Sequence, residues 1–252
     1  MLRVETLDDR RALGIRAGAD VAAELRRLLE RQASVRAMFA AAPSQTETLE
    51  ALVAAPGIDW NRVTAFHMDE YVGLRHGAPE RFGAWLSRAL FDRVPFGAVH
   101  VIDPGDDPDA EAARYGALVT EAPMDLVCLG IGVTAHLAFN DPPDADLADP
   151  AAVKLVELDL ESRRQQVADE CFAALDEVPT HALTVTIPPL VAGRRLFCMV
   201  PGALKARAVR ATLREPVSAG TPSTVLRGHP ACTLYLDAES AALLDPAERN
   251  AA

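Results

Sequence analysis

The chain has 252 residues, half of them hydrophobic, which is enough for one large globular domain with a sizeable core. Its formal net charge of −11 argues against a general nucleic-acid surface, because such a surface needs clustered lysine and arginine. The first residues are charged, and no run approaches about 18 apolar residues. We therefore expect a cytoplasmic protein with no signal peptide and no membrane contact.

Apolar residues recur at helical spacing in residues 19–32, between arginines and glutamates. Short apolar runs alternate with such segments along the rest of the chain. The expected helices are 19–32, 46–53, 82–91, 110–120, 205–213 and 239–244, and the expected strands are 35–40, 63–66, 99–102, 126–129, 153–158, 182–186, 196–200 and 233–236. This alternation predicts one Rossmann-like α/β domain over residues 1–252, with a mostly parallel central sheet flanked by helices on both faces.

The cysteines are spread along the chain without the paired spacing that a zinc site needs. Most of them lie in apolar surroundings, which is typical of buried free thiols. We therefore predict reduced cysteines and no bound metal. The four residues are Cys128, Cys171, Cys198 and Cys232.

Two adjacent carboxylates, Asp69 and Glu70, follow the strand expected at 63–66. Ligands of open α/β sheets bind outside the carboxyl ends of the strands. A carboxylate that removes a proton next to a carbonyl needs a raised pKa, and a second carboxylate beside it favours that shift. A helix cap or a solvated turn would also explain such a pair. The flanking residues, Phe-x-Met before and Tyr-Val-Gly-Leu after, favour a site.

A second polar cluster follows the strand expected at 126–129. The turn Gly130-Ile131-Gly132 allows the backbone to approach a ligand closely, but it lacks the third glycine of a dinucleotide fingerprint, so no cofactor is predicted. His136 is suited to relaying protons between a sugar ring oxygen and solvent, with Asp141 in reach to orient it. A purely structural histidine is the alternative.

Residues 66–74 (Phe-His-Met-Asp-Glu-Tyr-Val-Gly-Leu) resemble the first motif of the glucosamine-6-phosphate deaminase/isomerase family. Residues 130–141 (Gly-Ile-Gly-Val-Thr-Ala-His-Leu-Ala-Phe-Asn-Asp) resemble its second motif. The likeness continues through residues 178–184, 201–205 and 222–230, and so extends over nearly the whole chain. Several motifs in the family's order and at its intervals are more specific than any one of them. The resemblance implies the deaminase/isomerase type of α/β fold.

The resemblance also implies a cofactor-free conversion of glucosamine 6-phosphate and water to fructose 6-phosphate and ammonia. Asp69 would move a proton between C2 and C1, and His136 would assist ring opening, with Asp141 at the position of the family's acidic partner. Lys205 matches the lysine that binds the substrate phosphate, a task that suits a compact charge on a flexible stem. The further residues expected to bind substrate or phosphate are Ser44, Thr46, Glu70 and Gly132.

The second motif departs from the family's pattern directly before the histidine. Thr134 stands where the family has aspartate or asparagine, and Ala135 stands where it has glycine. Thr134 is counted among the catalytic positions, but threonine cannot hold a negative charge. We therefore expect slower ring opening, or a substrate form other than the closed ring.

The expected phosphate site also departs from the family. Residues 40–46 (Ala-Ala-Ala-Pro-Ser-Gln-Thr) lack the glycines that let backbone amides cradle a phosphate, and Pro43 removes one donor. No clear counterpart of the family's phosphate-binding arginine precedes residue 178, although Arg163 and Arg164 lie upstream. A smaller, neutral or differently phosphorylated substrate stays open.

Two other functions remain as alternatives. One is a catalytically weakened sensor that binds a sugar phosphate, which Thr134 and the altered loop favour. The other is a hydrolase like the 6-phosphogluconolactonases, which share the fold but which the form of the first motif disfavours. In each case the expected partner is a small sugar phosphate, and a homo-oligomer stays open.

Overall fold

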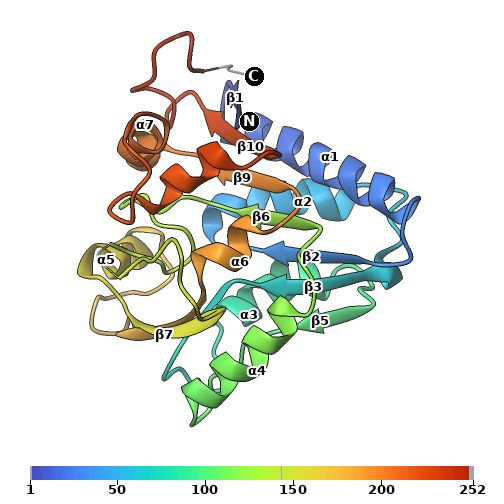
Figure 1. The fold of residues 1–252 in the computed structure, drawn as a ribbon, viewed down its shortest axis with the longest axis vertical. Coiled ribbons are helices and arrows are strands. Elements are labelled where there is room, and N and C mark those ends of the chain that lie inside the picture. Colours follow the sequence, from blue (N-terminus) through green and yellow to red (C-terminus); the bar gives the residue numbers. More distant parts are fainter. Residues whose placement is uncertain (1, 143, 250–252) are drawn as a thin grey trace.

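The computed structural model describes residues 2–142 and 144–249. A seven-stranded sheet runs through its centre, and each pair of neighbouring strands is parallel (Figure 1). In spatial order the strands are β1 (Arg3–Leu7), β10 (Cys232–Asp237), β9 (Leu196–Val200), β6 (Leu126–Leu129), β2 (Val35–Phe39), β3 (Val63–His67) and β5 (Ala98–His100). The predicted mostly parallel α/β sheet is therefore confirmed.

Neighbouring residues of a strand point to opposite faces of the sheet. Apolar side chains therefore project from both faces of this sheet, and helices cover both. Phe39 of β2 packs with the helices of one face, and Met38 packs with those of the other. The first face carries α1 (Arg10–Leu29), α2 (Thr46–Ala54), α3 (Phe82–Leu86) and the π-helical turn η3 (Ser87–Phe91). The second face carries α4 (Pro108–Thr120), α6 (Ile187–Val191) and α7 (Ala206–Arg214).

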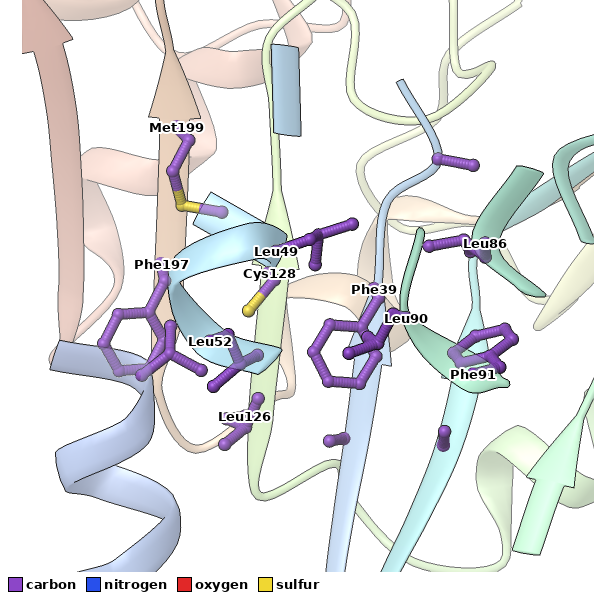
Figure 2. Close-up of a cluster of buried hydrophobic side chains, with 14 of the residues drawn as sticks. Phe39, Leu49, Leu52, Leu86, Leu90, Phe91, Leu126, Cys128, Phe197 and Met199 are labelled. Atoms are coloured by element: carbon purple, nitrogen blue, oxygen red, sulfur yellow. The ribbon is translucent and has the colours of Figure 1, made fainter. Parts of the chain in front are cut away.

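The core of the first face is built around α2 (Figure 2). Leu49 and Leu52 of this helix point at the sheet, where they meet Cys128 and Phe197. Phe39 lies beside them and makes an edge-to-face contact with Phe91, with ring centroids 6.4 Å apart. Burial of each such side chain stabilises the fold by roughly 1.5–3 kcal/mol. The packing fixes the carboxyl ends of β2 and β6 relative to the first turn of α2.

A second, three-stranded sheet lies apart from the first and is antiparallel, in the order β4 (Asp69–Tyr71), β8 (His181–Val185) and β7 (Val153–Glu157). The strands expected at 153–158 and 182–186 thus exist but do not belong to the parallel sheet. The backbone amide of Val185 donates to the carbonyl of Met68 at 2.7 Å. The small sheet therefore extends the structure beyond the carboxyl end of β3, where Asp69 begins β4.

Helix α1 begins at Arg10, nine residues before the predicted start. The Asp9 side chain caps it by accepting from the amide of Ala12 at 2.7 Å. Glycines interrupt the apolar pattern in this half of the helix. A β-carbon on Gly18 would lie 2.6 Å from Ala51 of α2, so the missing side chain allows the two helices to pack closely.

The helix expected at 239–244 is not present. The segment forms successive turns, in which Leu244 bonds back only three residues to Ala241. Asp237 binds the amide of Ser240 with its side chain and so supports a turn instead of a helix. The four cysteines are free thiols, of which Cys171 alone is partly exposed. No helix in the described ranges is long and apolar enough to cross a membrane.

Candidate active site

A cavity opens at the carboxyl ends of β2, β3, β6 and β9. It lies where the strand order reverses, because the chain proceeds from β2 to β3 and β5 on one side and from β6 to β9 and β10 on the other. This is the position at which open α/β sheets bind ligands. The polar residues that line it are Ser44, Gln45, Asp69, His136, Gln165, Gln166 and Lys205.

Asp69 presents its carboxyl group to the cavity although the residue is only 7% exposed. No hydrogen-bond donor reaches that carboxyl group in the described part of the chain. Burial raises the pKa of Asp69 well above its usual value, and the charge of Glu70 raises it further. A carboxylate with a raised pKa is a stronger base, which suits proton abstraction near neutral pH.

The Glu70 side chain does not line the cavity, although it was expected to bind substrate. Its carboxylate accepts hydrogen bonds from the backbone amides of Tyr71, Phe82 and Gly83, at 2.9–3.0 Å. The guanidinium of Arg81 lies 3.5 Å away. Adjacent residues of a strand face opposite sides, so Glu70 points away from the cavity that Asp69 faces. Its carboxylate accepts from amides at the start of α3 that have no partner within the helix.

His136 lies in the cavity wall, and its Nδ1 atom contacts Asp141 Oδ1 directly. The Thr134 hydroxyl donates to the same oxygen at 2.8 Å and lies 2.8 Å from Nδ1. Burial alone would raise the pKa of Asp141. The charge and hydrogen bond of His136, together with the hydroxyl groups of Ser162 and Thr134, outweigh burial, so the pKa is lowered. Asp141 thus supplies the negative charge that Thr134 cannot.

The backbone around His136 is tightly constrained. A β-carbon on Gly132 would collide with the imidazole ring, so only glycine leaves room for it there. Ala135 has φ +62°, in the left-handed region that glycine adopts more readily. This conformation explains why the family's pattern has glycine at this position. The alanine of this chain adopts the same conformation under strain.

Lys205 is the one lysine or arginine among the described residues that line the cavity. It ends the short helix η4 (Ala203–Lys205) and directly precedes α7. The Asp237 carboxylate binds the amide of Gly202 at 2.9 Å and so anchors the turn that carries the lysine. Burial lowers the pKa of Lys205 to about 8, against the opposing effect of Asp169.

The loop after β2 contributes Ser44 to the cavity, but Thr46 does not line it and instead begins α2. Gln45, which was not predicted, lies between them and is buried. Its Nε2 atom donates to Met199 O at 3.3 Å and to Ser44 Oγ at 3.2 Å. The side chain thereby links the loop to β9, and a buried glutamine in a polar loop carries no sequence pattern that would reveal it.

The two arginines upstream of residue 178 point away from the cavity. Arg163 donates to the carbonyls of Leu175 and Val178 at 2.8 Å, and Arg164 pairs with Glu161 on the surface at 2.7 Å. The same helix, α5 (Leu160–Ala168), instead presents Gln165 and Gln166 to the cavity, and neither was predicted. The described residues that line the cavity therefore supply one cation, Lys205, and several neutral donors.

The sequence model of the family described as glucosamine-6-phosphate isomerases/6-phosphogluconolactonase matches residues 8–234. The chain belongs to this family. A glucosamine-6-phosphate deaminase of Exiguobacterium sp. is 37% identical over 186 residues, which cover 73% of this chain and 71% of that protein. A glucosamine-6-phosphate deaminase of Listeria welshimeri is 32% identical over 211 residues, which cover 83% and 88% of the two chains. The resemblance seen in the motifs is confirmed.

Solved structures of the family share the fold at low sequence identity. A structure of a monomeric glucosamine-6-phosphate deaminase superposes with a TM-score of 0.85 at 24% identity, over 96% of this chain and 98% of the other. A 6-phosphogluconolactonase from Thermotoga maritima superposes with a TM-score of 0.75 at 17% identity, over 94% and 100%. Both branches of the family therefore have this architecture.

Proposed function

We propose that the chain is a deaminase/isomerase that converts glucosamine 6-phosphate and water to fructose 6-phosphate and ammonia. The observation that carries the proposal is a single cavity lined by the buried residue Asp69, by Lys205 and by His136, which contacts Asp141 behind the cavity wall. A base of raised pKa, a proton relay and a cation for phosphate are the three functions that this reaction needs. The relatives named as deaminases support the same substrate class.

Ring opening is assigned to His136. The closed sugar opens when the C1 hydroxyl loses its proton and the ring oxygen gains one, and an imidazole at the cavity wall transfers protons of this kind. Asp141 holds the Nδ1 side of the ring, which leaves Nε2 for the sugar. Thr134 supports Asp141 with a hydrogen bond instead of contributing a charge.

Proton transfer between carbons is assigned to Asp69. In the open aldose its carboxylate removes the proton from C2 and returns a proton to C1. One further proton passes from the amine nitrogen to the C1 oxygen, so the C1 aldehyde becomes an alcohol and the C2 amine becomes an imine. Water then adds to the C2 imine carbon, and ammonia leaves to give the ketone of fructose 6-phosphate. The raised pKa of Asp69 makes its carboxylate basic enough for the first step.

Binding of the phosphate is assigned to Lys205 and Ser44. Lys205 directly precedes α7, and Ser44 lies in the loop that leads from β2 into α2. The N-terminus of a helix favours anions. The glutamines Gln165 and Gln166 offer neutral donors where the family has an arginine. A substrate of this type belongs to cytoplasmic metabolism, which is where we place the protein.

A substrate panel tests the proposal. Purified protein is supplied separately with glucosamine 6-phosphate, unphosphorylated glucosamine and 6-phosphogluconolactone, and release of ammonia or of acid is followed. We expect ammonia release from the first compound, with a much lower kcat/KM for the second. Hydrolysis of the lactone alone would assign the chain to the lactonase branch, and calorimetric binding of glucosamine 6-phosphate without turnover would make it a sensor.

A further inference from the structure

Ser162 of α5 contacts both members of the His136–Asp141 pair but does not itself line the cavity. Its hydroxyl lies 2.8 Å from each carboxylate oxygen of Asp141 and 3.2 Å from His136 Nδ1. The residue is 1% exposed. Asp159 caps α5 and accepts from the amide of Ser162 at 3.3 Å, which fixes the turn that delivers the hydroxyl. Nothing in the sequence pattern singles out this serine.

Helix α5 is held mainly by polar contacts. Ser162 is the one fully buried residue of the helix, which has no continuous apolar face, and Val167 adds a partly buried contact. Helices in globular proteins normally dock through an apolar stripe. Here Gln165 accepts from the amide of Val133 at 3.1 Å, and Arg163 donates to the carbonyls of the following loop. A buried serine in such a helix must find a strong acceptor, and Asp141 is that acceptor.

The two oxygens of Asp141 have different partners within the described part of the chain. His136 and Thr134 contact Oδ1 alone, whereas the Ser162 hydroxyl lies 2.8 Å from both oxygens and is the one side chain among the described residues that reaches Oδ2. A carboxylate held at one oxygen can rotate about its Cβ–Cγ bond, and a second contact at the other oxygen fixes its plane. The orientation of the carboxylate in turn sets the direction of the His136 ring.

We propose that Ser162 is a positioning residue, which holds the Asp141 carboxylate in the plane that directs His136 at the sugar ring oxygen. This inference rests on the proposed function, in which His136 opens the ring. Ser162 does not line the cavity, so its effect must pass through its contacts with Asp141 and His136 and not through contact with substrate.

The charges near Asp141 do not duplicate this role. Among the described residues, the titratable group whose charge acts on its carboxylate is His136. The charged residues of α5 are engaged elsewhere, since Arg164 and Glu161 pair on the surface and Arg163 binds backbone carbonyls. Loss of the Ser162 hydroxyl therefore leaves Asp141 with fewer donors and raises its pKa toward the usual value.

The test compares Ser162→Ala and Ser162→Thr with the control Arg164→Ala. The control removes an exposed side chain that lies within one turn of Ser162 on α5. With glucosamine 6-phosphate we expect Ser162→Ala to lower kcat about ten-fold while KM changes less than about two-fold. Ser162→Thr keeps the hydroxyl and should recover most of kcat. Arg164→Ala should match the wild-type protein in both constants.

A readout without substrate separates this inference from the proposed function. Carboxyl-carbon NMR follows the titration of Asp141, assigned by its loss in Asp141→Asn. In Ser162→Ala we expect its midpoint to rise by about one pH unit. An unchanged midpoint, or a rise in KM as large as the fall in kcat, overturns the role of Ser162. Absence of ammonia release by the wild-type protein overturns the proposed function instead, and the NMR titration still decides Ser162.

Discussion

Asp69 and Glu70 are neighbours in β4, yet their carboxylates lie in opposite surroundings. The first faces the cavity with no hydrogen-bond donor among the described residues, and the second accepts from the amide of Tyr71 and from two amides at the start of α3. Two acidic residues that look equivalent in the sequence therefore have separate tasks. One is free to exchange a proton, and the other holds the adjacent helix in place.

Replacement of Glu70 by glutamine should affect stability more than chemistry. The variant loses the charge opposite Arg81 and turns an NH2 group toward backbone amides that need an acceptor. We expect the free energy of unfolding to fall by about 2–4 kcal/mol in denaturant titrations. Glu80→Gln, at an exposed glutamate of the loop between β4 and α3, is the matched control and should change stability little. Equal stability of the two variants would refute the assigned role of Glu70.

Thr134 should matter through its hydroxyl group. Thr134→Val keeps the shape but removes the donor to Asp141, and we expect kcat to fall about five- to ten-fold with little change in KM. Thr134→Ser keeps the donor and should stay near the wild-type rate. Steady-state assays of ammonia release make the comparison. If both variants lose activity equally, the side chain acts by packing and not by its hydrogen bond.

Ala135 should be a site where glycine stabilises the protein. The left-handed conformation costs an alanine about 1–2 kcal/mol, part of which is offset by the greater freedom that glycine gives the unfolded chain. We expect Ala135→Gly to raise the free energy of unfolding by about 0.5–1 kcal/mol. The same change at Ala113, in the middle of α4, should lower it by about 1 kcal/mol. Thermal and denaturant unfolding of both variants check the opposite signs.

Binding of the phosphate should weaken in mildly alkaline solution. The pKa of Lys205 is lowered to about 8 by burial, so its ammonium group is charged below that pH and neutral above it. We expect KM for glucosamine 6-phosphate to rise as the pH passes through about 8. Lys205→Arg keeps its charge in this range and should lack that rise. A KM that follows the same pH curve in both proteins would exclude Lys205 as the cause.

Much of the architecture could be predicted because short apolar runs alternate with helical patterns. The motifs also placed Asp69, His136 and Lys205 in one site, since each follows a strand of the parallel sheet. Helix α5 could not be predicted, because it is polar on nearly all sides and buries a serine. The two antiparallel strands at 153–157 and 181–185 were found as strands, but periodicity carries no information about the sheet to which a strand belongs.

Local sequence pattern predicts less of the site than of the fold. Gln45, Gln165 and Ser162 are uncharged, and their contribution depends on contacts between segments far apart in the sequence. The strand period does predict opposite faces for Asp69 and Glu70, but which face meets the cavity depends on how β4 pairs with β8. Tertiary pairing, and not local pattern, decided these assignments.

The most direct test of the account is the conversion of glucosamine 6-phosphate in deuterium oxide by the wild-type protein and by Asp69→Asn, followed by NMR. We expect the wild-type protein to form fructose 6-phosphate and ammonia, with deuterium incorporated at C1 as the carboxyl group exchanges with solvent. Asp69→Asn should fold normally and form neither product, because an amide cannot accept the C2 proton. Product formation by Asp69→Asn at the wild-type rate would contradict the assignment of Asp69 as the base.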